Sequence, residues 1–318
     1  MTRPTFPQIE EADADGDLAA AYTEMRATLR VPWVMFAARA LAVFGGFVPA
    51  AWQSAQPVFA TRGLEAAADE IRAAALMSDP APPDPRPSLA RAGIYEDTSL
   101  PAIRSALDAL NYGNPKYLLL ITAWCEGIQG RSSGGTHPTV GTRPGTGTGT
   151  GTGPHAGFDT APLPSGTPAG MPVLHLVDPA AASETVAGLL AEITDAHFHH
   201  GPASDFRVLA NWPDALSVLH REVLAPVVRT EAYDRTARAL LDLARARVAA
   251  FPAPAGLSAE QVAAVCSDTE RAAVTAMLAM FQRFIPDVTI DAVRLAHALD
   301  GAEHAAAPAF PPPNGCPD

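Results

Sequence analysis

The chain has 318 residues, a formal net charge of −12 and a pI of about 5.1. Hydrophobic residues make up 48% of it and charged residues 18%, a balance typical of a globular protein with a buried core. It has no run of Lys and Arg long enough to form a basic patch, which excludes nucleic-acid and anionic-membrane binding as its main function.

Helical signals dominate the first 131 residues. Asp17 can cap a helix that continues to about Arg30. Residues 31–52 are apolar and long enough to cross a bilayer, but Arg39 and Pro49 interrupt them, so we predict a buried helix–turn–helix and no membrane span. Apolar periodicity predicts the remaining helices of this half at residues 64–76, 100–110 and 117–128.

Residues 132–172 are built from Gly, Thr, Pro and Ser, and include the repeat GTGTGTGTG at 145–153. Such a segment buries too little apolar surface to offset its ordering entropy, so it is predicted to be a flexible linker. Residues 305–318 are predicted to be a loose tail. Between this linker and this tail, helices are predicted at residues 181–197, 214–224, 233–249, 258–266, 268–284 and 288–299. Since no run alternates with period two, the predicted fold class is all-α.

The two halves on either side of the linker are faintly similar. The matching positions are offset by 168–171 residues, and they are Leu41-Ala42 with Leu209-Ala210, Thr61 with Thr230, and Pro115 with Pro286. Small loop insertions would produce such a slowly drifting offset. We therefore predict two related helical repeats, 1–131 and 173–304, arranged as a pseudo-twofold pair with a site at their junction.

The first polar segment of interest is NYGNPKY at 111–117, between two apolar helices. Pro115 suits the first turn of a helix and Asn114 suits the cap before it. Amide and phenol groups beside a helix N-terminus could bind a small anion or orient a water molecule. A simple capped turn explains the same residues equally well.

The second segment is HHGPASDF at 199–206. Asp205 has apolar neighbours there, and a partly desolvated carboxylate has a raised pKa and is a stronger base toward water. A helix-capping Asp is an equal alternative. On a helix His197 and His200 share a face while His199 points elsewhere, so packing histidines are favoured and no metal site is predicted.

Cys125, Cys266 and Cys316 are far apart and form neither a CxxC pair nor a zinc-binding spacing. An odd number of scattered cysteines is a poor disulfide framework, so a reducing cytoplasm is the expected location. The missing CxxC pair also excludes a thiol-dependent peroxidase of the alkylhydroperoxidase D-like type.

Long strings of residues in one order resemble the group I 2-haloacid dehalogenases, over nearly the whole chain outside the linker and the tail. These strings are TLRVPWV (28–34), NYGNPKYLLLITA (111–123), HHGPASDF (199–206), LANWP (209–213), EVLAPV (222–227) and DGAE (300–303). The resemblance implies an all-helical fold of two repeats, a site between them and a homodimer. It also implies hydrolysis of short 2-haloalkanoic acids to 2-hydroxy acids with inversion, by direct attack of water and without an ester intermediate. No metal or organic cofactor is expected.

By position, the resemblance implies that Asp205 is the base that activates water and that Asn114 helps to orient that water. Tyr117 and Ser204 would line the substrate site. Trp33 and Phe36 would form an apolar wall toward the leaving halide, although both are equally well explained as core aromatics.

Thr61 and Glu65 match a Thr and a Glu implicated in some family members. They stand four residues apart, so on a helix their side chains would share one face. Glu65 is a second candidate for the base and is ranked below Asp205. A non-catalytic helical binding protein on the same scaffold is the remaining alternative, and only an activity measurement distinguishes it.

Overall fold

The computed structural model describes residues 6–77, 79–131 and 157–312. Within those ranges the chain is helical and has no strand, only an isolated bridge between Thr61 and Pro162. The predicted all-α class is therefore confirmed. The helices before residue 131 are α1 (Gly16–Leu29), α2 (Phe36–Leu41), α3 (Phe47–Phe59), α4 (Arg62–Ala74), α5 (Arg86–Arg91) and α6 (Leu100–Ile128). Those after residue 157 are α7 (Glu184–His197), α8 (Ser204–Leu209), α9 (Pro213–Leu219), the π-helical η1 (His220–Leu224), α10 (Glu231–Ala249), α11 (Ala259–Val265), α12 (Asp268–Asp300) and α13 (Ala302–Ala306).

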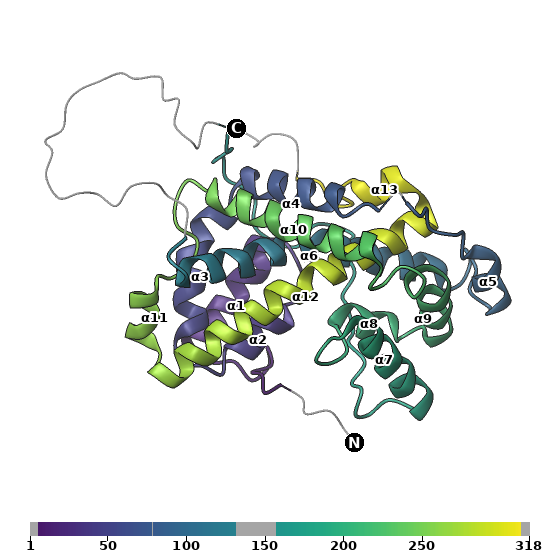
Figure 1. Cartoon of the computed structure of the whole chain (residues 1–318), viewed down its shortest axis with the longest axis horizontal. Coiled ribbons are helices and arrows are strands. Elements are labelled where there is room, and N and C mark those ends of the chain that lie inside the picture. Colours follow the sequence, from purple (N-terminus) through teal and green to yellow (C-terminus); the bar gives the residue numbers. More distant parts are fainter. Residues whose placement is uncertain (1–5, 78, 132–156, 313–318) are drawn as a thin grey trace, which may run out of the picture.

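The two longest helices, α6 and α12, pack against each other at the centre of the molecule. Helices α4 and α10 lie side by side and both contact α6 (Figure 1). Two short helices each contact the long helix of the other half of the chain: α2 contacts α12, and α8 contacts α6. Parts of the chain far apart in sequence therefore meet beside the central pair.

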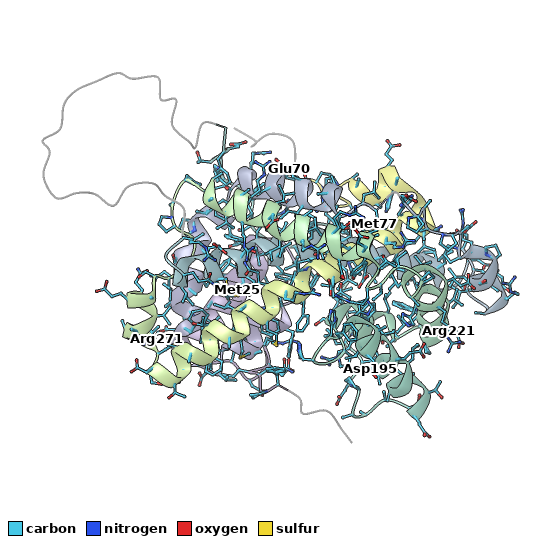
Figure 2. The ribbon with its side chains drawn as sticks, in the orientation of Figure 1. Met25, Glu70, Met77, Asp195, Arg221 and Arg271 are labelled. Atoms are coloured by element: carbon cyan, nitrogen blue, oxygen red, sulfur yellow. The ribbon has the colours of Figure 1, made fainter. Side chains whose placement is uncertain are left out.

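Side chains follow the usual division between core and surface. Met25 and Met77 are 2% and 5% exposed, whereas charged residues such as Glu70 and Arg221 reach solvent (Figure 2). Among the described residues, none of the helices is both long enough and apolar enough to cross a membrane. The apolar stretch at 31–52 forms α2 and the start of α3, in agreement with the predicted helix–turn–helix.

The predicted helix boundary at Asn114 and Pro115 is wrong, since α6 runs through both residues. Pro115 has no N–H to donate to the carbonyl of Asn111, one turn earlier. The buried Arg72 donates from Nε to that carbonyl oxygen at 3.1 Å, which satisfies it and lets the helix continue. The second predicted break is also wrong, because α12 continues through Pro286.

The C-terminal boundary predicted for the flexible linker, residue 172, is too late. Residues 132–156 lie outside the described residues, but the segment from 157 onward binds to the N-terminus of α4. The backbone N–H of Gly63 donates to the carbonyl of Asp159 at 2.7 Å, and that of Leu163 donates to the carbonyl of Ala60 at 2.8 Å. A side chain at Gly63 would meet the Phe158 ring at 2.6 Å, so glycine permits this close approach.

The predicted loose tail begins too early. Ala305 is in α13, is fully buried, and its carbonyl accepts a 2.9 Å hydrogen bond from Nδ2 of Asn111. Phe310 packs edge-on against the Tyr112 ring, with 5.6 Å between the ring centroids. The chain therefore stays attached to α6 beyond residue 305.

The predicted cap at Asp17 is also corrected, since α1 begins at Gly16 and Asp17 lies in its first turn. Helix α1 ends at Leu29, and the following residue, Arg30, adopts a left-handed conformation with φ of 61°. In the second half, capping boxes start α11 at Ser258 and α12 at Ser267, as their sequences suggest.

Candidate active site

A cavity of about 100 Å³ lies where α8 and the segment before it face α6 and α12. The predicted site residues that line it are Trp33, Phe36, Asn114, Tyr117, Ser204 and Asp205. The other lining residues are Met35, Ala37, Leu110, His199, His200, Gly201, Pro202, Ala203, Phe281, Phe284, Ile285 and Val288. Both halves of the chain contribute walls, and most of the lining is apolar, as in many small-ligand sites.

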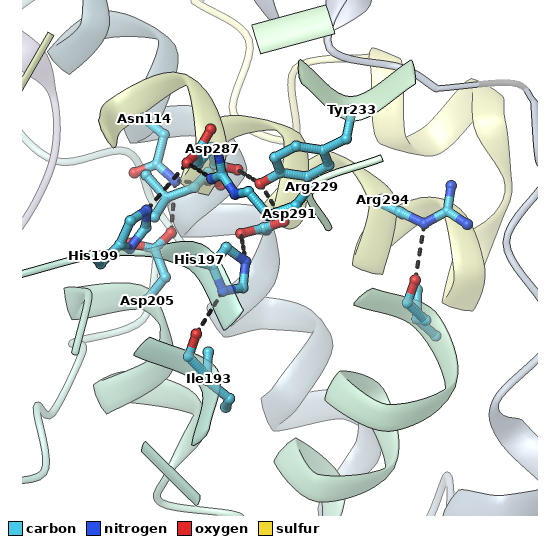
Figure 3. Close-up of polar contacts among 12 residues, drawn as sticks. Asn114, Ile193, His197, His199, Asp205, Arg229, Tyr233, Asp287, Asp291 and Arg294 are labelled. Carbon is cyan, nitrogen blue, oxygen red and sulfur yellow. Dashed lines mark hydrogen bonds and ion pairs between the residues drawn. The ribbon is translucent and has the colours of Figure 1, made fainter. Parts of the chain in front are cut away.

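Asp205 lies in the first turn of α8 and is 7% exposed. Nδ2 of Asn114, on α6, donates to its Oδ1 at 2.6 Å and also lies 3.3 Å from the carbonyl oxygen of Val288 (Figure 3). Burial raises the pKa of Asp205 to about 7; the Asn114 hydrogen bond opposes this shift, and the charge of Asp291 adds to it. The site therefore holds a carboxylate that is a far stronger base than a solvated one.

An aromatic wall stands beside this carboxylate. Tyr117 donates from its hydroxyl to the carbonyl of Trp33 at 2.9 Å, and the two rings meet edge-on with centroids 6.1 Å apart. Gly113 lies behind Trp33, where a Cβ would be 2.8 Å from the indole Cζ2. The position of Trp33 thus depends on its hydrogen bond with Tyr117 and on the absence of a side chain at 113.

A buried polar network fixes the cavity loop to α12. Nε2 of His199 lies 3.3 Å from Oδ2 of Asp287, which is also paired with Arg229 (Figure 3). Arg283, one turn earlier on α12, pairs with the same carboxylate. Burial opposes the charge of Asp287, but its partners hold its pKa below the usual value. Burial lowers the pKa of His199, so the His199 ring is neutral at neutral pH and Nε2–H donates to the aspartate.

A second buried pair lies close to the first. Nε2 of His197 lies 3.0 Å from Oδ2 of Asp291, and Nδ1 lies 2.7 Å from the carbonyl oxygen of Ile193. Tyr233 donates to Oδ1 of Asp291 at 3.0 Å. Both ring nitrogens of His197 therefore lie near oxygen atoms of other residues. Although burial opposes protonation, Asp291 raises the pKa of His197.

Thr61 and Glu65 do not line the cavity. Thr61 precedes α4, and its hydroxyl donates to the carbonyl of Val58 at 2.7 Å. Glu65 is buried in a polar cluster in which its Oε1 accepts from Nζ of Lys116 at 2.6 Å and from the Tyr112 hydroxyl at 2.8 Å. Glu65 is engaged in this cluster and lies outside the cavity that contains Asp205, so the interpretation of Glu65 as a base is not supported.

The histidines and α12 residues that line the cavity were missed in the sequence. His199 and His200 are predicted to be packing residues, and for Phe281 and Phe284 nothing is predicted beyond the helix at residues 268–284. No local pattern distinguishes a phenylalanine facing a cavity from one facing the core. Within the described parts of the chain, no three His, Cys, Asp or Glu side chains are grouped so that they could hold a metal ion.

The fold and site define an all-helical protein with a buried carboxylate beside a small apolar cavity, and comparisons with known proteins identify its family. The family model described as "Halocarboxylic acid dehydrogenase DehI" matches residues 32–197. The configuration-inverting 2-haloacid dehalogenase of Alcaligenes xylosoxydans xylosoxydans is 43% identical over 98% of this chain and 100% of its own length. That of Pseudomonas sp. (strain 113) is 40% identical over 94% of this chain and 93% of its own length. The chain therefore belongs to the DehI family of 2-haloacid dehalogenases, which are hydrolases acting on carbon–halide bonds.

Solved structures give the same result for the fold. A D-2-haloacid dehalogenase mutant in complex with D-2-CPA aligns with a TM-score of 0.78 at 25% identity, over 95% of this chain and 99% of the other. A D-2-haloacid dehalogenase in complex with L-LA aligns with a TM-score of 0.78 at 26% identity, with the same coverage.

Proposed function

We propose that this protein hydrolyses short 2-haloalkanoic acids to 2-hydroxy acids of inverted configuration, with Asp205 as the base. The observation that carries the proposal is the 2.6 Å hydrogen bond from Asn114 to the buried Asp205 carboxylate at the edge of an apolar cavity. Because Asn114 occupies Oδ1, the second carboxylate oxygen is available to accept a proton from water. Asn114 also offers its amide oxygen to orient that water.

The reaction then needs one displacement. Water donates a proton to Asp205 as its oxygen forms a bond to C2, and the carbon–halogen bond breaks on the opposite side with its electron pair leaving as halide. Inversion follows from this in-line geometry, and positioning supplies much of the rate. The products are the 2-hydroxy acid, halide and a protonated Asp205, which loses its proton to solvent before the next turnover. Trp33 and Phe36 would exclude other water from the site.

A single-turnover experiment in H₂¹⁸O with excess enzyme tests this mechanism. Direct attack by water places ¹⁸O in the hydroxyl group of the first product molecule. An ester formed on Asp205 would place unlabelled carboxylate oxygen there instead. Running D- and L-2-chloropropionate separately, with chiral analysis of the lactate, also gives the enantiomers accepted. Absence of halide release from either would favour a non-catalytic binding protein on this scaffold.

The pH dependence of kcat/KM is predicted from the same carboxylate. Asp205 must be ionised to act as a base, and burial raises its pKa to about 7. We expect kcat/KM to be constant above about pH 8 and to fall roughly tenfold per pH unit below about pH 6. Halide release measured from pH 4.5 to 9 checks this. An acid limb near pH 4, where a solvated aspartate titrates, would contradict a desolvated base.

A Gly113→Ala substitution is predicted to lower kcat/KM about tenfold by displacing Trp33. The new Cβ would lie 2.8 Å from Cζ2 and 3.2 Å from Cη2 of the indole, so the ring must shift from its position in the cavity wall. Gly188→Ala is the matched control, because a Cβ there meets nothing within 4 Å and only helix propensity changes. Equal kcat/KM in both variants, measured by halide release, would show that the position of Trp33 is unimportant.

We also propose that the chain consists of two related repeats. Four parallels support this proposal. Helices α2 and α8 both have six residues, α1 and α7 both end in a left-handed residue, and α6 and α12 both contain an internal proline. Thr61 and Thr230 both precede a helix and donate to a carbonyl three residues earlier at 2.7 Å. The homodimer and the cytoplasmic location implied by the resemblance stay predictions.

A further inference from the structure

His200 lines the cavity and has no part in the proposed displacement. Its ring is surrounded by phenylalanines: the centroid of Phe6 lies 4.6 Å away, that of Phe284 5.3 Å, that of Phe36 5.8 Å and that of Phe281 5.9 Å. Burial lowers the pKa of His200 to about 4, so the ring is neutral at neutral pH and carries one N–H group.

One nitrogen of this ring lacks a partner. Nδ1 of His200 is buried and makes no hydrogen bond within the described part of the chain. Buried polar atoms in native proteins almost always have a partner, because an unsatisfied donor or acceptor keeps the full cost of its desolvation. The four phenyl rings offer no strong acceptor. The missing partner is therefore expected to be a molecule that enters the cavity.

The proposed substrate needs such a donor. A 2-haloacid is an anion at neutral pH, yet the described residues that line the cavity include no Lys or Arg. Several of the polar groups are already engaged: Asn114 donates to the catalytic carboxylate, Tyr117 to a backbone carbonyl, and His199 is paired with Asp287. Of the remaining side-chain donors on this wall, His200 has the buried unpartnered nitrogen.

We propose that His200 binds the carboxylate of the substrate, with Nδ1–H as the hydrogen-bond donor. This inference rests on the proposed function. The carboxylate is the natural partner because it is the strongest acceptor on the substrate and stays charged throughout the reaction. Hydrogen bonds to charged groups are stronger than neutral ones, and the phenyl rings around His200 exclude the water that would weaken this one.

Binding of propionate, which has the carboxylate but no halogen, isolates this contact. We would measure its dissociation constant by calorimetry for the parent protein, His200→Phe and His200→Asn. The phenylalanine keeps a planar ring among its aromatic neighbours and removes the donor, so binding should weaken about 10- to 100-fold. The asparagine amide lies near the position of Nδ1 and should retain most of the affinity. His175→Asn, at an exposed position, is the control and should leave binding unchanged.

Turnover distinguishes the carboxylate from the halide as the group bound. If His200 binds the carboxylate, His200→Phe raises KM similarly for 2-chloro- and 2-bromopropionate. Unchanged propionate binding, with a fall in kcat that is larger for the chloride, would overturn the proposal in favour of a halide contact. Equal losses of affinity in His200→Phe and His200→Asn, with both variants folded by circular dichroism, would also overturn it.

The proposed function can fail separately. A parent protein that binds propionate through His200 but releases no halide from any 2-haloacid would leave the carboxylate contact standing and remove the dehalogenation reaction. If the parent releases halide while His200→Phe binds propionate as tightly as the parent does, the dehalogenation reaction stands and the His200 contact with the carboxylate is removed.

Discussion

Asp205→Asn is expected to lower kcat/KM for halide release by about 10²–10⁴-fold and, above pH 7, to make the protein more stable. The activity is lost because an amide cannot accept the proton of the attacking water, and a general base contributes a factor of about this size. The amide oxygen can still accept the hydrogen bond from Asn114, so the geometry of the site should persist. A loss of activity without a loss of stability separates a catalytic carboxylate from a structural one.

The gain in stability follows from the pKa of Asp205. Folding raises this pKa from 3.8 to about 7, so the favourable contribution of the protonated form is fully present below about pH 4 and is lost as the pH rises through 7. At pH 8 the ionised group costs about 4 kcal/mol, by the conversion of about 1.4 kcal/mol per pKa unit. The asparagine variant does not carry this cost.

Thermal and urea unfolding at pH 5 and pH 8 checks this prediction. The difference between Asp205→Asn and the parent should be clearly smaller at pH 5 than at pH 8. Asp195→Asn, at an exposed position on α7, is the control for the exchange of a carboxylate for an amide. A variant that is less stable than the parent at both pH values would mean that Asp205 stabilises the fold. Its loss of activity would then not identify Asp205 as the base.

The sequence predicts Asp205 and Asn114 as site residues, but the helix cap that it predicts at Asn114 is wrong. A helix cap before Pro115 was the local expectation, because proline usually begins or ends a helix. The burial of Arg72 against the carbonyl of Asn111 overrides that preference. Arg72 lies 39 residues earlier in the chain, so no local rule could include it.

Because α6 is continuous, the side chains of the polar segment at residues 111–117 lie on two different faces of this helix. On a helix of 3.6 residues per turn, Leu110, Asn114 and Tyr117 share one face and line the cavity. Tyr112 and Lys116 share the other face and join the cluster around Glu65 instead. A turn at residues 111–117 does not predict these two faces. A continuous helix over the same residues does predict them, because its spacing separates the cavity-lining residues from those of the Glu65 cluster.

The far wall of the cavity lay beyond any inference from local sequence. Phe281 and Phe284 lie on α12, about 80 residues after Asp205, and reach the site because α12 packs on α6. His199 and His200 follow the left-handed Phe198 that ends α7, and this turn directs the loop toward the cavity. Tertiary packing fixes these positions, and their residue types are equally common in ordinary cores.

Glu65→Gln is expected to destabilise the protein by about 3–5 kcal/mol and to leave the activity per folded molecule nearly unchanged. The Glu65 carboxylate is 4% exposed and the Lys116 ammonium 1% exposed, and removing one member of a buried ion pair leaves the other charge uncompensated. Burial already lowers the pKa of Lys116 to about 7 against the opposing effect of Glu65. Without Glu65 the lysine has to lose its proton or remain charged without a partner, and both cost stability.

Glu70→Gln is the matched control, because Glu70 stands five residues further along α4 and pairs with Arg247 at the surface, where the two side chains are 47% and 42% exposed. An exposed pair of this kind contributes about 0–1 kcal/mol, so the control should unfold nearly as the parent does. Urea unfolding at pH 7.5 gives the stabilities, and halide release at a temperature where each variant is folded gives the activities. If Glu65→Gln stays folded but releases no halide while Asp205→Asn retains turnover, then Glu65 is the base after all. The reverse pattern assigns Glu65 to the internal cluster that holds α4 against α6, and leaves the chemistry to the carboxylate on α8.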